Sequence, residues 1–296
     1  MRILVTGASG LLGHKIRGMA ESCGHTVFGT YNLHTITGSG MKKADLVDQS
    51  AVESVIAETE PDVVINTASL TDVDRCESDF EKALAINGKM PGVLAKACSH
   101  LGSVLVQVST DYVFDGERGN YNEDDMPHPI NRYGKSKLEG ELQVAANSRD
   151  YCIARTSALY GWGRSYRHDF ATWMLEKWAR SEEVRAVTDQ YVSPTLNTNL
   201  ARMILEVAER KITGTIHLSG SSRISRHEFA IMLARRFNFN ESLVLAARSD
   251  ALGWVARRPR DSSLNVSKAL QGLNNKPISI QAALDEFHAE GVGIHR

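Results

Sequence analysis

The chain has 296 residues, of which 42% are hydrophobic and 23% charged, a composition that provides ample material for a globular core. Its formal net charge of −1 at pH 7 gives no reason to expect nucleic acid or an anionic membrane as a partner, and no apolar run approaches the roughly 20 residues of a membrane-spanning helix. Four widely spaced cysteines form no Cys-x-x-Cys pair, so we expect reduced thiols in a cytoplasmic protein without disulfides.

The first half of the chain alternates strand-length apolar runs with helix-length segments. Strands are expected at residues 3–5, 26–28, 63–65, 104–108 and 152–154, and helices near 11–21, 50–58, 80–98 and 132–146. Strands that alternate with helices indicate right-handed βαβ units with helices on both faces of a parallel sheet. We therefore predict an α/β fold, a Rossmann-like doubly wound parallel sheet with a smaller α/β C-terminal substrate region.

The second half is less regular and contains no internal repeat or long Pro/Gly linker. We expect a dinucleotide-binding domain over residues 1–155 and a mainly substrate-binding region over 156–296. An amphipathic helix is expected at 200–208, and a second helix follows Ser225, because Ser225 and Glu228 have capping-box spacing. The first domain is also expected to receive about 184–212, with 184–187 as a strand that returns to its sheet.

Glycines at positions 7, 10 and 13 follow the first predicted strand and open the first helix. Glycine permits a tight turn and lets the backbone approach a pyrophosphate, whose charge is favoured by the free N–H groups at the helix N-terminus. A lone glycine pattern is weak evidence, but the strand-loop-helix context favours a dinucleotide site. Contacts are expected from Gly7, Ser9, Gly10, Leu11, Leu12 and Gly13.

Further cofactor contacts are expected near the carboxyl ends of the following strands, where a parallel sheet binds its ligands. Asp45 and Leu46 are placed to border an adenine, with a solvated turn as the alternative. The residues after the 63–65 strand are small and leave room for a ligand, although a simple turn also explains them. The expected contacts are Thr30, Asp45, Leu46, Thr67, Ala68, Ser69 and Asn87.

The end of the second strand bears on the choice of nicotinamide cofactor. An NAD-selective site usually has an acidic residue there to bind the ribose 2′-OH, but residues 28–32 contain no Asp or Glu. Cations that could reach a 2′-phosphate are Lys15, Arg17, Lys42 and Lys43. We therefore predict that NADPH is modestly preferred and that NADH remains usable.

Tyr133 and Lys137 are four residues apart and so share one face of a helix. A lysine cation beside the phenol is expected to lower its pKa toward neutrality, and its ammonium group can also bind the cofactor ribose. Thr110 ends a predicted buried strand in a cluster of polar residues and can donate a hydrogen bond to a carbonyl oxygen that Tyr133 protonates. The alternatives are a solvated helix face and a strand end capped by polar residues.

The glycine loop, residues 109–116 and the helix that carries Tyr133 and Lys137 resemble the extended short-chain dehydrogenase/reductase superfamily. Within it the chain most resembles the dTDP-4-dehydrorhamnose reductase family, also over 189–195 and 257–264. The resemblance implies NAD(P)H-dependent reduction of the 4-keto group of a nucleotide-linked 6-deoxy sugar, with Thr110, Tyr133 and Lys137 as catalytic residues. The implied substrate contacts are Thr71, Asp111, Tyr112, Arg257 and Arg260.

Arg257 and Arg260 belong to the densest basic cluster of the chain, where guanidinium groups could bind a diphosphate; a solvated basic loop is the alternative. Two positions depart from the family pattern. Ala158 stands where the bacterial reductases have tryptophan. Lys15 stands where some members have a glutamate that holds Mg²⁺ at a dimer interface, so we expect no metal, although a homodimer remains possible.

Two other functions fit the same motifs. A nucleotide-sugar epimerase or dehydratase of this fold would retain its NAD⁺ through the reaction cycle. A protein resembling the regulatory subunit of methionine adenosyltransferase would bind NADP and a partner enzyme without catalysis.

Overall fold

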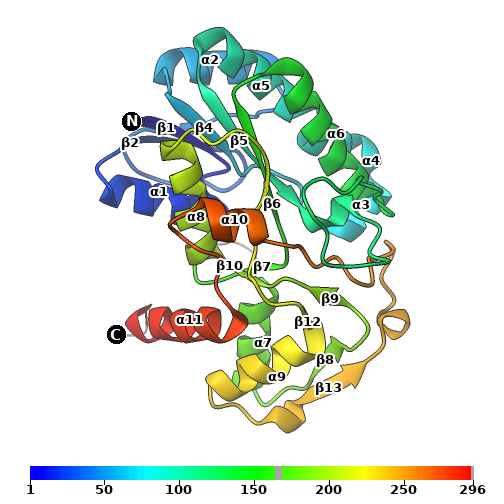
Figure 1. The fold of residues 1–296 in the computed structure, drawn as a ribbon. Coiled ribbons are helices and arrows are strands. Elements are labelled where there is room, and N and C mark those ends of the chain that lie inside the picture. Colours follow the sequence, from blue (N-terminus) through cyan, green and yellow to red (C-terminus); the bar gives the residue numbers. More distant parts are fainter. Residues whose placement is uncertain (164–168, 295–296) are drawn as a thin grey trace.

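The computed structural model describes residues 1–163 and 169–294 and is built around one seven-stranded parallel sheet (Figure 1). The strand order is β11-β6-β5-β4-β1-β2-β3, and Val5 of β1 lies between Ile65 of β4 and Gly29 of β2. This architecture confirms the predicted fold class. Its strands are β1 (Arg2–Thr6), β2 (Thr26–Tyr31), β3 (Met41–Lys43), β4 (Val63–Asn66), β5 (Val104–Thr110), β6 (Tyr151–Thr156) and β11 (Gly214–His217).

Helices cover both faces of this sheet, which explains why β4 and β5 are buried along nearly their whole length rather than on alternate residues. Helices α1 (Leu11–Ser22) and α8 (Asn197–Glu209) pack together and share one hydrophobic core with the sheet. The other core contains residues of α2 (Gln49–Thr59), α5 (Met90–Leu101) and α6 (Arg132–Asn147). The remaining helices of this half are α3 (Val73–Ser78) and α4 (Phe80–Ala83), with the short 3₁₀ turn η2 (Asp111–Val113).

The predicted helix at 80–98 is interrupted by η1 (Leu84–Lys89), a π-helical segment between α4 and α5. A π-helix inserts an extra residue into a turn and is frequent at functional sites. Here the insertion presents Asn87 to the loop that follows β4. Sequence periodicity does not reveal such an insertion, because the apolar pattern on either side remains helical.

A second group of short elements surrounds its own core below the sheet, as the lower half of Figure 1 shows. That core is rich in aromatic residues, among them Tyr160, Trp178, Phe229 and Phe287. The strands are β7 (Leu159–Tyr160), β8 (Val184–Val187), β9 (Tyr191–Val192), β10 (Thr195–Leu196), β12 (Ile224–Ser225) and β13 (Val244–Ala247). The helical elements are α7 (Phe170–Ala179), α9 (Arg226–Arg236), η3 (Glu241–Leu243), η4 (Ser249–Leu252) and α11 (Ile280–Ile294). Helix α10 (Ser267–Gly272) instead packs against β11, and its Ala269 belongs to the core that α1 and α8 share with the sheet.

Two expectations for the second half have different outcomes. The capping box before α9 is confirmed: the Ser225 hydroxyl accepts from the Glu228 N–H at 3.1 Å, and the Glu228 carboxylate accepts from the Ser225 N–H at 2.7 Å. The return of residues 184–187 to the first sheet is wrong, because β8 pairs in parallel with β13 instead. Helix α8, within the 184–212 span, packs against α1. The domain boundary near residue 155 remains a prediction.

Among the described residues, we find no helix that is both long and apolar enough to cross a membrane.

Candidate active site

A cavity of about 920 Å³ opens at the carboxyl ends of β1, β4 and β5, the edge at which open parallel sheets bind ligands. One wall comes from the sheet and α6, and the other from α7, β8 and the segment around residues 252–258. Twelve residues predicted from sequence meet here: Gly10, Leu11, Leu12, Gly13, Thr67, Ser69, Thr71, Thr110, Asp111, Tyr112, Tyr133 and Lys137.

The glycine loop forms a backbone cradle that side chains would fill. Gly7 has φ +67°, and a Cβ there would lie 2.8 Å from the Ala68 nitrogen. A Cβ on Gly13 would lie 2.4 Å from the Gly7 oxygen. Gly10 is the N-cap of α1 and has no side chain to satisfy the first N–H groups of that helix. This end of α1 therefore fits the pyrophosphate of a dinucleotide.

Asn87 does not line the cavity but holds the loop after β4, which does. Its Oδ1 accepts from the Ser69 hydroxyl at 2.9 Å and from the Leu70 N–H at 2.8 Å. Its Nδ2 donates to the Leu70 carbonyl at 3.0 Å and to the Ser136 hydroxyl at 3.1 Å. The amide thereby joins the loop after β4 to helix α6, and its direct contact with a cofactor remains a prediction.

Several expected cofactor residues do not line this cavity. Thr30 is buried, and its carbonyl accepts from the Ala8 N–H at 2.9 Å. Asp45 is exposed and caps a local turn through the Val47 N–H at 3.2 Å, and Leu46 is buried in the core beside α2. Their cofactor contacts stay predictions, as do those of Gly7, Ser9 and Ala68.

Lys137 is buried on the inner face of α6, which begins after the N-cap Asn131. Its ammonium group donates to the Val108 carbonyl at 2.8 Å. Burial lowers the pKa of Lys137 from 10.5 to about 8, while Glu141 and Cys76 oppose this shift. Lys137 is therefore mostly a cation at neutral pH.

Tyr133 lies one helical turn before Lys137, half-buried in the cavity wall. Burial raises the pKa of its phenol above the usual value of 10, and a hydrogen bond with Thr110 partly opposes that increase. The predicted lowering of this pKa toward neutrality is therefore wrong, because burial raises the pKa and the acidic groups of Asp111, Cys76 and Tyr112 add to that rise. A phenol with a raised pKa keeps its proton at neutral pH and suits a proton donor.

Asp111 directly follows strand β5, is buried, and accepts hydrogen bonds from three hydroxyl groups. Its carboxylate accepts from Ser157 at 2.8 Å and from Thr110 at 3.0 Å, and also from Ser262. Burial raises the pKa of Asp111, while these hydrogen bonds oppose the rise. The sequence singled out neither Ser157 nor Ser262, and their distance along the chain from Asp111 left no signal to find them.

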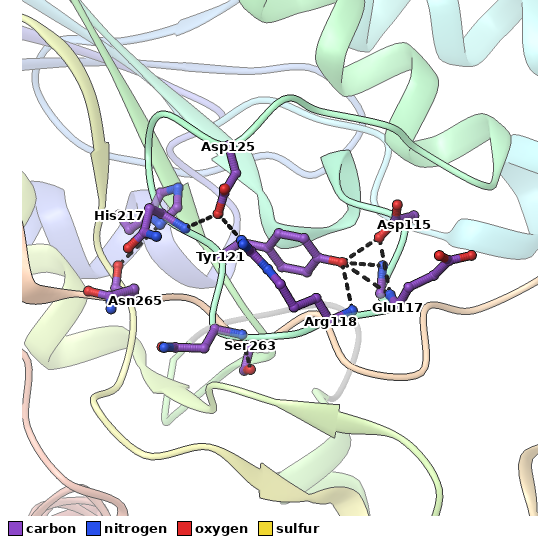
Figure 2. Close-up of polar contacts among 11 residues, drawn as sticks. Asp115, Glu117, Arg118, Tyr121, Asp125, His217, Ser263 and Asn265 are labelled. Atoms are coloured by element: carbon purple, nitrogen blue, oxygen red, sulfur yellow. Dashed lines mark hydrogen bonds and ion pairs between the residues drawn. The ribbon is translucent and has the colours of Figure 1, made fainter.

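The loop after β5 is fastened to the C-terminal segment that supplies Ser262, as Figure 2 shows. The Tyr121 hydroxyl accepts from the main-chain N–H groups of Gly116 and Glu117, both at 3.1 Å, and donates to Asp115. The Tyr121 N–H donates to the Ser263 carbonyl at 3.0 Å, and the Asn265 N–H donates to the Tyr121 carbonyl at 2.8 Å. We call residues 115–125 and 261–265 the clasp.

A buried ion pair between Arg155 and Glu141, which the sequence did not predict, lies next to strand β5. Arg155 of β6 donates to both carboxylate oxygens of Glu141, at 2.7 and 3.0 Å, and the Ser109 hydroxyl donates to Glu141 at 2.5 Å. Both charged side chains are only 5% exposed. The one available signal was that Glu141 lies one helical turn beyond Lys137 on α6.

The basic cluster is placed differently from the expectation. Arg258 lines the cavity, pairs with Asp74 at 3.0 Å and lies over the Trp254 ring. Arg257 and Arg260 are exposed and are not among the residues that line the cavity. Their contact with a substrate diphosphate is therefore unsupported by their position.

Comparison with known proteins agrees with this geometry. Residues 1–292 match the family described as RmlD substrate binding domain. The probable low-salt glycan biosynthesis reductase Agl14 of Haloferax volcanii is 37% identical and covers 90% of each chain. The methionine adenosyltransferase 2 subunit beta of Pongo abelii is 34% identical over 90% of this chain and 81% of its own. The dTDP-4-dehydrorhamnose reductase of Bacillus anthracis in complex with NADP superimposes with a TM-score of 0.88, at 31% identity over 98% and 99% of the two chains.

Proposed function

Because the chain belongs to the RmlD substrate binding domain family, we propose that it is an NAD(P)H-dependent reductase of the 4-keto group of a nucleotide-linked 6-deoxy sugar, with dTDP-4-dehydrorhamnose as its substrate. The observation that carries this proposal is the meeting of Thr110, Tyr133 and Lys137 in one cavity with the N-terminus of α1. The NADP-bound relative with the same fold supports NADPH as the cofactor, with NADH also usable.

Each residue has a role that follows from its surroundings. A bound NADPH supplies a hydride, and the cradle of residues 7–13 would hold its pyrophosphate. Tyr133, which is protonated at neutral pH, donates its phenolic proton to the ketone oxygen, which becomes strongly basic as the hydride arrives. The Thr110 hydroxyl, which donates to Asp111 at 3.0 Å in this structure, would turn its one proton to the same ketone oxygen when substrate binds. Lys137 binds the ribose and supplies positive charge beside the phenol.

The experiment that tests this function is NADPH oxidation with dTDP-4-keto-6-deoxy sugars, with UDP- and GDP-linked analogues alongside. We expect turnover with the dTDP-linked ketone. Purified protein that retains NAD⁺ and interconverts sugars without net oxidation would be an epimerase or dehydratase. No turnover of any keto sugar, with copurification of a methionine adenosyltransferase, would instead identify a regulatory subunit. The intact catalytic set favours the enzyme.

The cellular location and the assembly state complete the proposal. We propose a cytoplasmic protein, in keeping with its four free cysteines. A homodimer is proposed on the family resemblance alone, and size-exclusion chromatography with light scattering tests it.

A further inference from the structure

Arg226 is the first residue of α9 and reaches the cavity from the second wall. Two contacts with the buried Gln190 fix its position. Its N–H donates to the Gln190 carbonyl at 3.1 Å, and its Nε donates to the Gln190 side-chain oxygen. The guanidinium carbon also lies 5.5 Å from the centre of the Phe170 ring. The side chain is thus oriented before any ligand binds.

The two terminal nitrogens of Arg226 donate to no acceptor within the described part of the chain, and no carboxylate there forms a salt bridge with it. Three arginines line the cavity among the described residues, and the other two differ from it. Arg258 is neutralised by Asp74 at 3.0 Å, and Arg185 is exposed on β8. Arg226 is the half-buried, oriented cation whose outer nitrogens remain available.

The charge of Arg226 lowers the pKa of Asp111 without a salt bridge between the two side chains. A half-buried guanidinium that forms no salt bridge among the described residues favours an anionic ligand, because the ligand restores the lost solvation and neutralises the charge. The terminal nitrogens form a fork that matches two phosphate oxygens. Gln190, which holds the other edge of the fork, also donates to the Tyr112 hydroxyl at 3.4 Å, next to the proposed sugar site. Arg226 therefore stands at the sugar end of the cavity.

We propose that Arg226 binds the diphosphate of the nucleotide-sugar substrate, in the role that the sequence assigned to Arg257 and Arg260. The inference rests on the proposed function, since it requires a nucleoside diphosphate in this cavity. It makes Gln190 a positioning residue that directs the fork of Arg226 toward the substrate.

The test compares two ligands that differ only in the diphosphate. dTDP and thymidine are titrated by calorimetry into the full-length wild-type protein, Arg226→Gln and Arg226→Lys, with saturating NADP⁺ to keep dTDP out of the dinucleotide site. Arg226→Gln should weaken dTDP binding by about 10- to 100-fold, the loss expected for a charge-assisted bidentate contact. Its thymidine affinity should not change. Arg226→Lys should recover part of the loss.

Arg235→Gln is the matched control, because Arg235 lies on the same helix but its side chain is 66% exposed and pairs with Glu241 at the surface. It should bind dTDP like the wild type. A dTDP affinity in Arg226→Gln within twofold of the wild type would overturn the proposal, as would an equal loss of thymidine binding.

If Arg226→Gln does not fold, the wild-type protein still gives an answer. Phenylglyoxal modification of Arg226, located by mass spectrometry, should be blocked by dTDP and not by thymidine. Equal modification with and without dTDP would refute the proposal. Failure of the wild type to bind dTDP, UDP or GDP would instead remove the nucleotide-sugar function itself, a distinguishable result.

Discussion

The Lys137 ammonium group donates a 2.8 Å hydrogen bond to the Val108 carbonyl, two residues before strand β5 ends at Thr110. One buried cation thus joins α6, which carries the proposed proton donor Tyr133, to β5, which carries Thr110, the proposed hydrogen-bond donor for the ketone. Because both groups depend on this link, changes at Lys137 should affect more than one property of the enzyme.

Activity should decline as the pH rises through about 8. The pKa of Lys137 is lowered to about 8, so its positive charge is present below that pH and lost above it. The Tyr133 phenol, whose pKa is raised, does not titrate in this window. kcat/KM measured across pH 6 to 10 reports the free enzyme. In Lys137→Arg the decline of kcat/KM should move to higher pH, since arginine keeps its charge. If the decline stays at the same pH, a group other than Lys137 causes it.

Replacing Tyr133 with Phe should reduce kcat by about 10²-fold or more, the effect of losing a positioned general acid. The hydroxyl is the only group removed, and the ring that remains can still pack edge-to-face with Tyr112, whose ring centre lies 5.8 Å away. NADPH affinity, measured by fluorescence titration, should therefore change little. Near-normal turnover would remove Tyr133 from the mechanism.

The sequence predicts the features that depend on neighbouring residues better than those that depend on packing between distant segments. The glycine loop and the Tyr133–Lys137 pair depend on neighbours close in the chain, so local spacing identified both. The pKa of Tyr133 depends on its burial beside Tyr112 and Asp111, which lie on another element, and the direction of its shift was predicted wrongly. Arg226 reaches the site through packing of α9 against Gln190, which no local pattern encodes. Strand β8 could pair with either sheet on sequence grounds, and only packing selects β13.

NADPH should have the higher kcat/KM of the two cofactors, and Arg17 is the cation placed to favour it. Lys15 is paired with Glu290 at 3.0 Å and Lys42 with Glu58, whereas Arg17 forms only a long pair with Glu21, at 3.9 Å. The Arg17 side chain extends to the loop after β2, where a Cβ on Gly38 would lie 3.4 Å from its Nη1. Arg17→Ala should weaken NADPH binding and leave NADH binding unchanged. A preference for NADH of tenfold or more, about 1.4 kcal/mol, would contradict this prediction.

EDTA should leave activity and assembly unchanged. The described residues contain no group of three or more His, Cys, Asp or Glu side chains that could hold a metal ion. At the position where some relatives hold Mg²⁺, Lys15 instead forms its ion pair with Glu290. Turnover and sedimentation are measured after EDTA treatment and again with added MgCl₂. Loss of activity that Mg²⁺ restores would show that other carboxylates bind the ion.

Arg155→Leu should lower the free energy of unfolding by roughly 3–5 kcal/mol, because it leaves the Glu141 carboxylate buried without its charge partner. Urea denaturation measures this change. The double variant Arg155→Leu/Glu141→Leu should recover much of the loss, since it removes both charges. A double variant as unstable as the single one would mean that the packing of Arg155 over Phe114, at 5.2 Å, matters more than the ion pair.

The clasp also determines at what point during synthesis the hydrogen bonds around Asp111 can be completed. Strands β1 to β6 are synthesised well before residues 261–265, so Asp111 still lacks the hydroxyl of Ser262 when these strands have left the ribosome. Until the clasp closes, a buried carboxylate next to the proton donor is incompletely hydrogen-bonded. The surroundings of the proposed proton donor are therefore complete only when nearly the whole chain has been synthesised.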